Sequence, residues 1–223
     1  MKKIWAFVLT LTMVFALAAC GNSNFSESNS AQAELSAVSA QTEPSSYGDI
    51  TQTEESSEPE TERTSNSLVV YFSWSGNTEA VANEIAAQTG ADVFEITPEE
   101  PYTDDYNALL DIAQEEQASG ARPAIAETVE DFAQYDVVYF GFPNWWGDMP
   151  MILYTFLDDY DFSGKTIAPF VTSGGSGFSS AISTIESLEP DATVVDGLSL
   201  GSSEAADPGD EVTEWLSSAG LTE

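Results

Sequence analysis

The sequence predicts an α/β fold with a doubly wound parallel sheet for residues 67–223. Short apolar runs alternate with segments of helical periodicity along this part of the chain. The runs Leu68–Phe72 and Val137–Phe142 are apolar at almost every position, which is typical of parallel strands buried on both faces. We therefore expect five parallel strands in the order 2-1-3-4-5, with helices on both faces of the sheet.

The boundaries of these elements follow from apolar periodicity and from Gly and Pro signals. Strands are expected at 68–72, 93–96, 137–142, 166–172 and 194–198, and helices at 78–89, 104–119, 149–156, 178–188 and 212–219. Gly90 is a stop signal for the first helix, and Pro150 lies near the start of the third. Pro169 interrupts the fourth strand because it has no N–H to donate, so we expect a bulge there.

The first 20 residues have the pattern of an export signal. Lys2 and Lys3 precede an apolar stretch up to Ala19, which is shorter than the roughly 20 residues that a spanning helix needs. Leu-Ala-Ala-Cys, ending at Cys20, resembles the lipobox of bacterial lipoproteins. The resemblance implies that residues 1–19 are a lipoprotein signal peptide and that Cys20 carries palmitate and anchors the chain to the extracytoplasmic face of a bacterial cell membrane. The alternative is an ordinary signal peptide with an incidental cysteine.

Residues 20–66 predict a disordered, acidic linker behind the lipid anchor. They are rich in Ser, Glu, Thr, Gln and Ala, and their few large apolar residues are isolated. Nine carboxylates face one cation, Arg63, so self-repulsion should extend the segment.

Composition excludes several classes of function. The chain has no histidine and one cysteine, Cys20, which excludes zinc chemistry, a Ser-His-Asp triad and a disulfide. We predict no metal site and no catalytic residue. Residues 67–223 contain 29 acidic residues but only Arg122 and Lys165 as cations, a formal charge of −27. This charge excludes nucleic-acid binding and suits partner proteins with basic docking surfaces. We expect a monomer.

The loop after the first strand has the composition of an anion cradle. Hydroxyl side chains, a glycine and a helix N-terminus together offer neutral donors to a phosphate group. The loop contains no lysine, so it is not a Walker A loop. Its residues are Ser73, Trp74, Ser75, Gly76, Asn77 and Thr78. The alternative is a capped helix start in a polar turn.

Two further loops follow the third and fourth strands. The first has adjacent tryptophans, which suit stacking on a planar ligand; they could instead pack over neighbouring helices. The second has three glycines in four positions, which let the backbone approach and donate to a flat ligand edge; it could instead be a flexible turn. The two loops are Pro143, Asn144, Trp145, Trp146 and Gly147, and Thr172, Ser173, Gly174, Gly175, Ser176 and Gly177.

The expected strand order brings the three loops together. The first and third strands are neighbours whose crossovers leave to opposite faces, and ligands of such sheets bind at the carboxyl ends beside that point. The sequence therefore predicts one site built from all three loops.

These motifs resemble those of the flavodoxin family over essentially all of residues 68–223. Ser73–Thr78 matches its phosphate loop, and the Pro-Asn-Trp-Trp-Gly loop resembles that of a branch of flavodoxin-like proteins. The resemblance implies noncovalent FMN binding, with the first loop on the phosphate and the other two on the isoalloxazine ring. It also implies electron carriage between redox partners. An NAD(P)H-dependent FMN or quinone reductase on the same fold, and a surface binding domain without flavin, remain alternatives.

Overall fold

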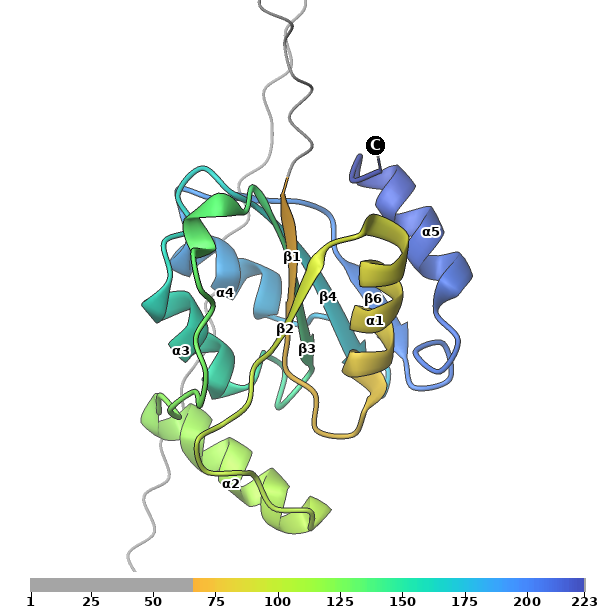
Figure 1. Ribbon diagram of the computed structural model, residues 1–223. Coiled ribbons are helices and arrows are strands. Elements are labelled where there is room, and N and C mark those ends of the chain that lie inside the picture. Colours follow the sequence, from red (N-terminus) through yellow and green to blue (C-terminus); the bar gives the residue numbers. More distant parts are fainter. Residues whose placement is uncertain (1–65, 223) are drawn as a thin grey trace, which may run out of the picture. The chain divides into compact units, whose positions relative to one another are not determined.

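The computed structural model describes residues 66–222, which form a parallel sheet with helices on both faces (Figure 1). The sheet order is β2-β1-β3-β4-β5, and β6 also pairs with β4, so the predicted fold class is confirmed. The strands are β1 (Ser67–Tyr71), β2 (Asp92–Glu95), β3 (Val137–Pro143), β4 (Thr166–Ser173), β5 (Thr193–Val194) and β6 (Leu198–Gly201).

The helices divide between the two faces of the sheet and its carboxyl end. Helices α1 (Asn77–Thr89) and α5 (Gly209–Ser218) cover one face, and α3 (Met151–Asp159) and α4 (Ala181–Leu188) cover the other. A short 3₁₀ helix, η1 (Phe132–Gln134), precedes β3. No helix within residues 66–222 is long and apolar enough to cross a membrane.

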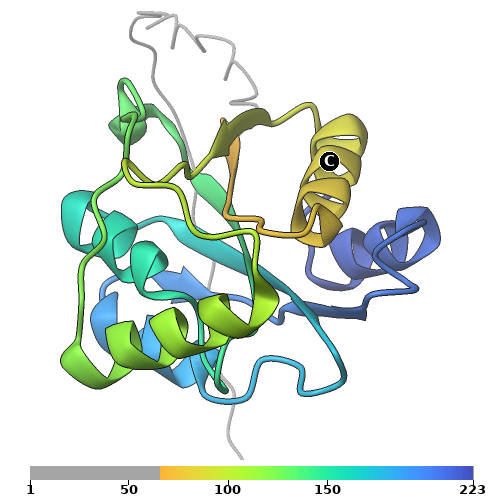
Figure 2. The same cartoon turned by 90° about the horizontal axis from the view of Figure 1, so that it is seen from below.

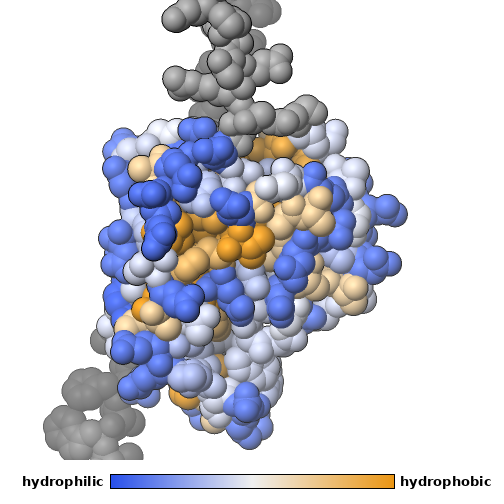
Figure 3. Space-filling view, in the orientation of Figure 1, coloured by the Kyte–Doolittle hydropathy of each residue, from blue (hydrophilic) through white to orange (hydrophobic). Residues whose placement is uncertain are grey.

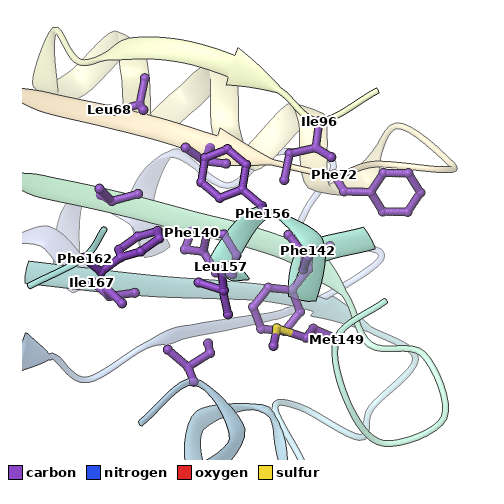
Figure 4. Close-up of a cluster of buried hydrophobic side chains, with 14 of the residues drawn as sticks. Leu68, Phe72, Ile96, Phe140, Phe142, Met149, Phe156, Leu157, Phe162 and Ile167 are labelled. Atoms are coloured by element: carbon purple, nitrogen blue, oxygen red, sulfur yellow. The ribbon is translucent and has the colours of Figure 1, made fainter. Parts of the chain in front are cut away.

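The apolar strands fill two cores, one on each face. Val69 belongs to the cluster under α1 and α5, and the next residue, Val70, belongs to the cluster under α3 and α4. Phe156 of α3 is fully buried in the second cluster, among other aromatic side chains (Figure 4). Burial of one such side chain contributes about 1.5–3 kcal/mol to the free energy of unfolding. The two cores together therefore fix the register of the strands.

The edge beyond β4 differs from the sequence prediction. The register of β3 and β4 is continuous from Val137 to Pro143, so the predicted bulge at Pro169 is wrong. The fifth strand is instead interrupted between β5 and β6, opposite Pro169. Val195 donates to Ile167 O, and alternation along β4 points the Pro169 nitrogen to the same side. The missing donor is therefore accommodated by a gap in the neighbouring strand.

Helix α2 (Tyr106–Ser119) lies beyond the carboxyl ends of the strands rather than on a sheet face (Figure 1). Seen from below, it crosses the α3 and α4 side of that end (Figure 2). Asp105 caps its first turn by accepting from Ala108 N at 2.8 Å, and Gly120 ends it in the left-handed conformation. The sequence predicted this helix but not its position.

The edge strand β2 is exposed. Figure 3 shows an apolar patch bordered by hydrophilic residues on the face where β2 lies in front. Val93 of β2 is 48% exposed, and within the described residues β2 pairs only with β1. The short length of β2 limits pairing of this edge with other chains.

The predictions for the signal peptide at 1–19, for Cys20 and for the linker up to residue 65 lie outside the described residues.

Candidate functional site

A cavity of about 340 Å³ lies between α2 and the three loops at the carboxyl end of the sheet. Its lining residues from the predicted loops are Trp74, Ser75, Asn77, Pro143, Asn144, Trp145, Trp146, Thr172, Ser173 and Gly174. Two other hollows, of about 420 and 470 Å³, lie beside Thr89 and beside Arg122, away from these loops. The structure thus brings parts of all three loops to one site.

The start of α1 forms the anion cradle of the cavity. Gly76 has φ 84°, and its N–H donates to Ser73 Oγ at 3.1 Å, which closes the loop on itself. No side chain caps the helix, and the N–H groups of Asn77, Thr78 and Glu79 have no acceptor among the described residues. Free N–H groups at a helix N-terminus attract an anion such as phosphate. The capped helix start is therefore not what the structure shows.

Thr78 plays a different part from the one predicted for its side chain. It is buried, and its Oγ1 lies 2.8 Å from Oγ1 of Thr172, at the end of β4. Thr172 O in turn accepts from Asn144 N at 2.9 Å. The Thr78 hydroxyl joins the loops together, and its backbone N–H has no acceptor among the described residues.

The tryptophan loop is a tight turn across residues 145–148. Trp145 and Asp148 exchange two backbone hydrogen bonds, of 2.8 and 3.1 Å. The two central residues, Trp146 and Gly147, have φ 53° and 83°, as in a type I′ turn. Positive φ is uncommon for a bulky residue and stores backbone strain. Here it belongs to the tryptophan at the cavity.

The two tryptophans of this turn have different environments. Trp145 is half-buried, with its ring edge-on to Phe72 and Tyr102 at centroid distances of 5.5 and 5.3 Å. Trp146 is 50% exposed, and its Nε1 donates to Leu110 O of α2 at 3.0 Å. Trp145 thus packs on neighbouring aromatic rings although it also lines the cavity, and the ring of Trp146 is the more exposed of the two.

The third loop is organised by one serine side chain. Ser173 Oγ accepts from the N–H groups of Gly175 and Gly177, at 3.2 and 2.9 Å. These two groups therefore point into the loop and not to a ligand, contrary to the prediction that the glycine backbone donates to one. Thr172, Ser173 and Gly174 line the cavity.

The remaining predicted binding residues belong to the three loops but lie outside the cavity lining. They are Ser73, Gly76, Thr78, Gly147, Gly175, Ser176 and Gly177, none of which lines the cavity.

Sequence reasoning missed one wall of the cavity. Tyr106, Leu109, Leu110 and Ala113 of α2 line it, as does Ser202 after β6. The apolar spacing of the α2 residues was visible but indicated only a helix face packed on a core. No signal in the sequence placed that face over the loops.

Neither described cation lies at the cavity. Arg122 pairs with Asp158 at 2.5 Å, and Lys165 is buried against the carbonyls of Ala133 and Tyr135. Below the first loop, burial raises the pKa of Tyr71 to about 12, and the carboxylates of Glu95 and Glu79 add to the shift. An anion in this cavity must therefore be held by neutral donors.

Comparisons with known proteins agree with this geometry. The flavodoxin family model matches residues 66–219. A candidate flavoprotein from Bacteroides eggerthii DSM 20697 is 33% identical, with a TM-score of 0.63 over 70% of this chain and 98% of that one. One from Bacteroides uniformis ATCC 8492 is 32% identical, with a TM-score of 0.62 over 69% and 98%.

A flavoprotein from Lactobacillus acidophilus NCFM, solved in complex with FMN, shares the fold. It is 24% identical, with a TM-score of 0.55 over 66% of this chain and 99% of that one. A comparison with curated proteins gave no match. The family match covers more than half of the chain, and the first of these relatives is matched along almost its whole length. The chain therefore belongs to the flavodoxin family.

Proposed function

We propose that this domain binds FMN noncovalently and carries electrons between redox partners. One observation carries the proposal: the start of α1, with its free N–H groups, reaches the cavity at Asn77, and the exposed ring of Trp146 lines the same cavity. The first suits a phosphate group and the second a flat aromatic ring, and FMN combines both. The Lactobacillus acidophilus relative with FMN supports this choice.

Different residues of the site would bind the phosphate and the ring of FMN. The N–H groups of Asn77, Thr78 and Glu79 would hold the phosphate without a cation. Trp146 would cover the ring on one side, and Ser173 and Gly174 would meet its edge. Bound FMN supplies the redox chemistry, while the chain binds it, orients it and restricts solvent.

The charges of the domain favour a carrier over an NAD(P)H-dependent reductase. A reductase needs room for a nicotinamide and preferably a cation for the NADPH phosphate. Arg122 and Lys165 are both engaged elsewhere, and neither lines the cavity. The formal charge of −27 for residues 67–223 suits basic partner surfaces instead.

Anaerobic mixing of the FMN-loaded protein with NADH or NADPH separates the two functions. A carrier keeps its flavin absorbance over minutes with either nucleotide and loses it with dithionite. Bleaching within seconds by a nucleotide would establish the reductase.

We further propose that Cys20 carries a lipid that anchors the domain at the extracytoplasmic face of a bacterial membrane. The basic, apolar and Leu-Ala-Ala-Cys segments support this proposal. A flexible linker of residues 20–66 would reach roughly 35–40 Å from the lipid. Cys20→Ser should release the protein from the membrane fraction and abolish palmitate labelling. If wild type and variant fractionate alike, the anchor is wrong.

A further inference from the structure

Asp148, which closes the tryptophan turn, is a carboxylate buried without a cation. It is 8% exposed, and Oδ1 accepts from its neighbour Met149 N at 2.8 Å. Oδ2 accepts from Tyr154 of α3 at 3.1 Å and Thr184 of α4 at 3.0 Å, and lies 3.1 Å from Ser180 Oγ. An isolated buried carboxylate is costly, so a set of donors from two helices indicates a specific role.

Ser180, at the start of α4, also holds the other half of the turn. Gly147 O accepts from Ser180 N at 3.0 Å, and Ser180 Oγ lies 2.7 Å from that oxygen. The single hydroxyl proton of Ser180 is therefore shared between Gly147 O and Asp148 Oδ2. Asn144 Oδ1 accepts from Gly147 N at 3.1 Å on the opposite side. Gly147 is thus held through both its N–H and its carbonyl oxygen.

The turn needs this support because Trp146 has a positive φ. A non-glycine residue in the left-handed region is disfavoured, and inside the turn only the two backbone hydrogen bonds between Trp145 and Asp148 oppose that strain. Trp146 itself is tied only by its bond to Leu110 O and is half exposed. Without the Asp148 carboxylate the turn would keep its backbone hydrogen bonds but lose its side-chain link to α3 and α4, and the indole ring would be held less firmly at the cavity.

We propose that Asp148 is the positioning residue of the ligand site: from behind the turn, its carboxylate fixes Trp146 over the cavity. This inference rests on the proposed FMN function, since Trp146 matters only through a planar ligand. Asp148 does not line the cavity, so it acts through Trp146 rather than by contact.

Tyr154 extends the support to the surface. Arg122 lies over its ring at 5.0 Å from the centroid and pairs with Asp158 at 2.5 Å. Burial, followed by the Asp148 carboxylate, raises the pKa of Tyr154, so the tyrosine stays a donor to Asp148 at physiological pH.

A double-mutant cycle on FMN affinity tests the proposal. Asp148→Asn keeps the shape but replaces one acceptor oxygen by an NH2 group, and Asp148→Ala removes both acceptor oxygens. We expect FMN dissociation constants to rise by about tenfold for Ala and less for Asn. In a Trp146→Ala background the same changes should cost about twofold or less, because their effect passes through the indole.

Separate controls test whether a loss of charge or a loss of stability explains the change in FMN affinity. Asp159→Asn removes one carboxylate from the exposed end of α3 and should leave FMN affinity within about twofold of wild type. The visible spectrum and the fluorescence quenching of bound FMN report ring contact independently of stability. Both should shift toward free FMN in Asp148→Ala. Thr184→Val, which removes one donor and keeps the carboxylate, should behave in the same direction if the alanine variant does not fold.

The outcomes are distinct. If wild type does not bind FMN, the proposed function fails. If wild type binds and Asp148→Asn binds equally well or more tightly, the positioning role is wrong and the carboxylate acts by charge repulsion or not at all. Equal losses with and without Trp146 would also overturn it.

Discussion

Thr78 Oγ1 and Thr172 Oγ1 form a buried hydrogen bond of 2.8 Å that joins the first turn of α1 to the end of β4. Through the bond from Asn144 N to Thr172 O, the tryptophan loop enters the same network. The three loops are therefore one hydrogen-bonded unit, although the chain separates them by 94 residues in the case of the two threonines. The anion cradle at the start of α1 and the tryptophan loop therefore belong to a single site.

Breaking this link should destabilise the domain. Thr172→Val keeps the shape but leaves the buried Thr78 hydroxyl without its partner, which costs about 1–3 kcal/mol of unfolding free energy. Urea denaturation followed by circular dichroism measures the change. Thr166→Val, at the half-buried other end of β4, should change stability by less than about 0.5 kcal/mol. Equal losses of unfolding free energy in the two variants would contradict a stabilising role for the Thr78–Thr172 hydrogen bond.

Trp146 should lower the stability of the flavin-free protein and raise its affinity for FMN. Trp146→Asn creates the Asn-Gly pair that type I′ turns prefer, so we expect the flavin-free protein to gain roughly 0.5–1 kcal/mol. FMN affinity should fall by about tenfold or more, because the open ring is lost. Thermal unfolding and FMN titration give the two values. Asp131→Gly relieves a similar backbone at φ 50°, away from the cavity, and should leave affinity unchanged.

Replacing glycine by alanine should destabilise the domain at Gly141 but leave its stability almost unchanged at Gly174. In Gly141→Ala the new Cβ would overlap the buried ring of Phe170, and overpacking of this kind costs about 1–3 kcal/mol. A Cβ on Gly174 meets nothing within 4 Å. Gly174→Ala should therefore keep the unfolding free energy within about 0.5 kcal/mol and weaken FMN, whose space it would enter. A stable Gly141→Ala variant would show that the core is less tightly packed there.

Glu189 should make stability depend on pH. Burial, followed by the carboxylates of Asp161 and Asp158, raises its pKa from 4.5 to about 7. The folded state then binds the proton more tightly than the unfolded state, so this carboxyl lowers stability as pH rises from about 4.5 to 7. Glu189→Gln should match wild type near pH 4 and exceed it above pH 7, by about 1 kcal/mol or less because the group is partly exposed.

Denaturant midpoints of wild type and Glu189→Gln across pH 4–8 measure this effect. Glu186→Gln, an exposed change in α4, the helix that Glu189 directly follows, serves as the control. A gain for Glu189→Gln that is the same at pH 4 and pH 8 would contradict the assignment.

Local patterns predicted the sheet and the three loops because both depend on residues close in sequence. Val69 and Val70 face opposite cores, and a run that is apolar at consecutive positions records that directly. Gly76 and the free N–H groups after it follow from a polar loop that meets a helix. Such features depend little on the rest of the chain.

Long-range placement was not predictable in the same way. The stripe of Leu109 and Ala113 on α2 has the same spacing whether it packs on a sheet or over a cavity. Pro169 predicted that one hydrogen-bond donor would be missing from β4. It did not predict that the neighbouring strand would be interrupted between β5 and β6 to accommodate the missing donor. Asp148 carries no local signal, because its donors come from α3 and α4 and meet it only in the folded chain.

The central claim is that one cavity holds both a phosphate and a flavin ring. Titration of the flavin-free protein with FMN and with riboflavin, followed by flavin fluorescence, tests it most directly. The account predicts one FMN per chain and riboflavin binding weaker by about tenfold or more, since riboflavin leaves the helix N–H groups of α1 unused. Equal affinity for the two flavins, or no binding of either, would contradict it.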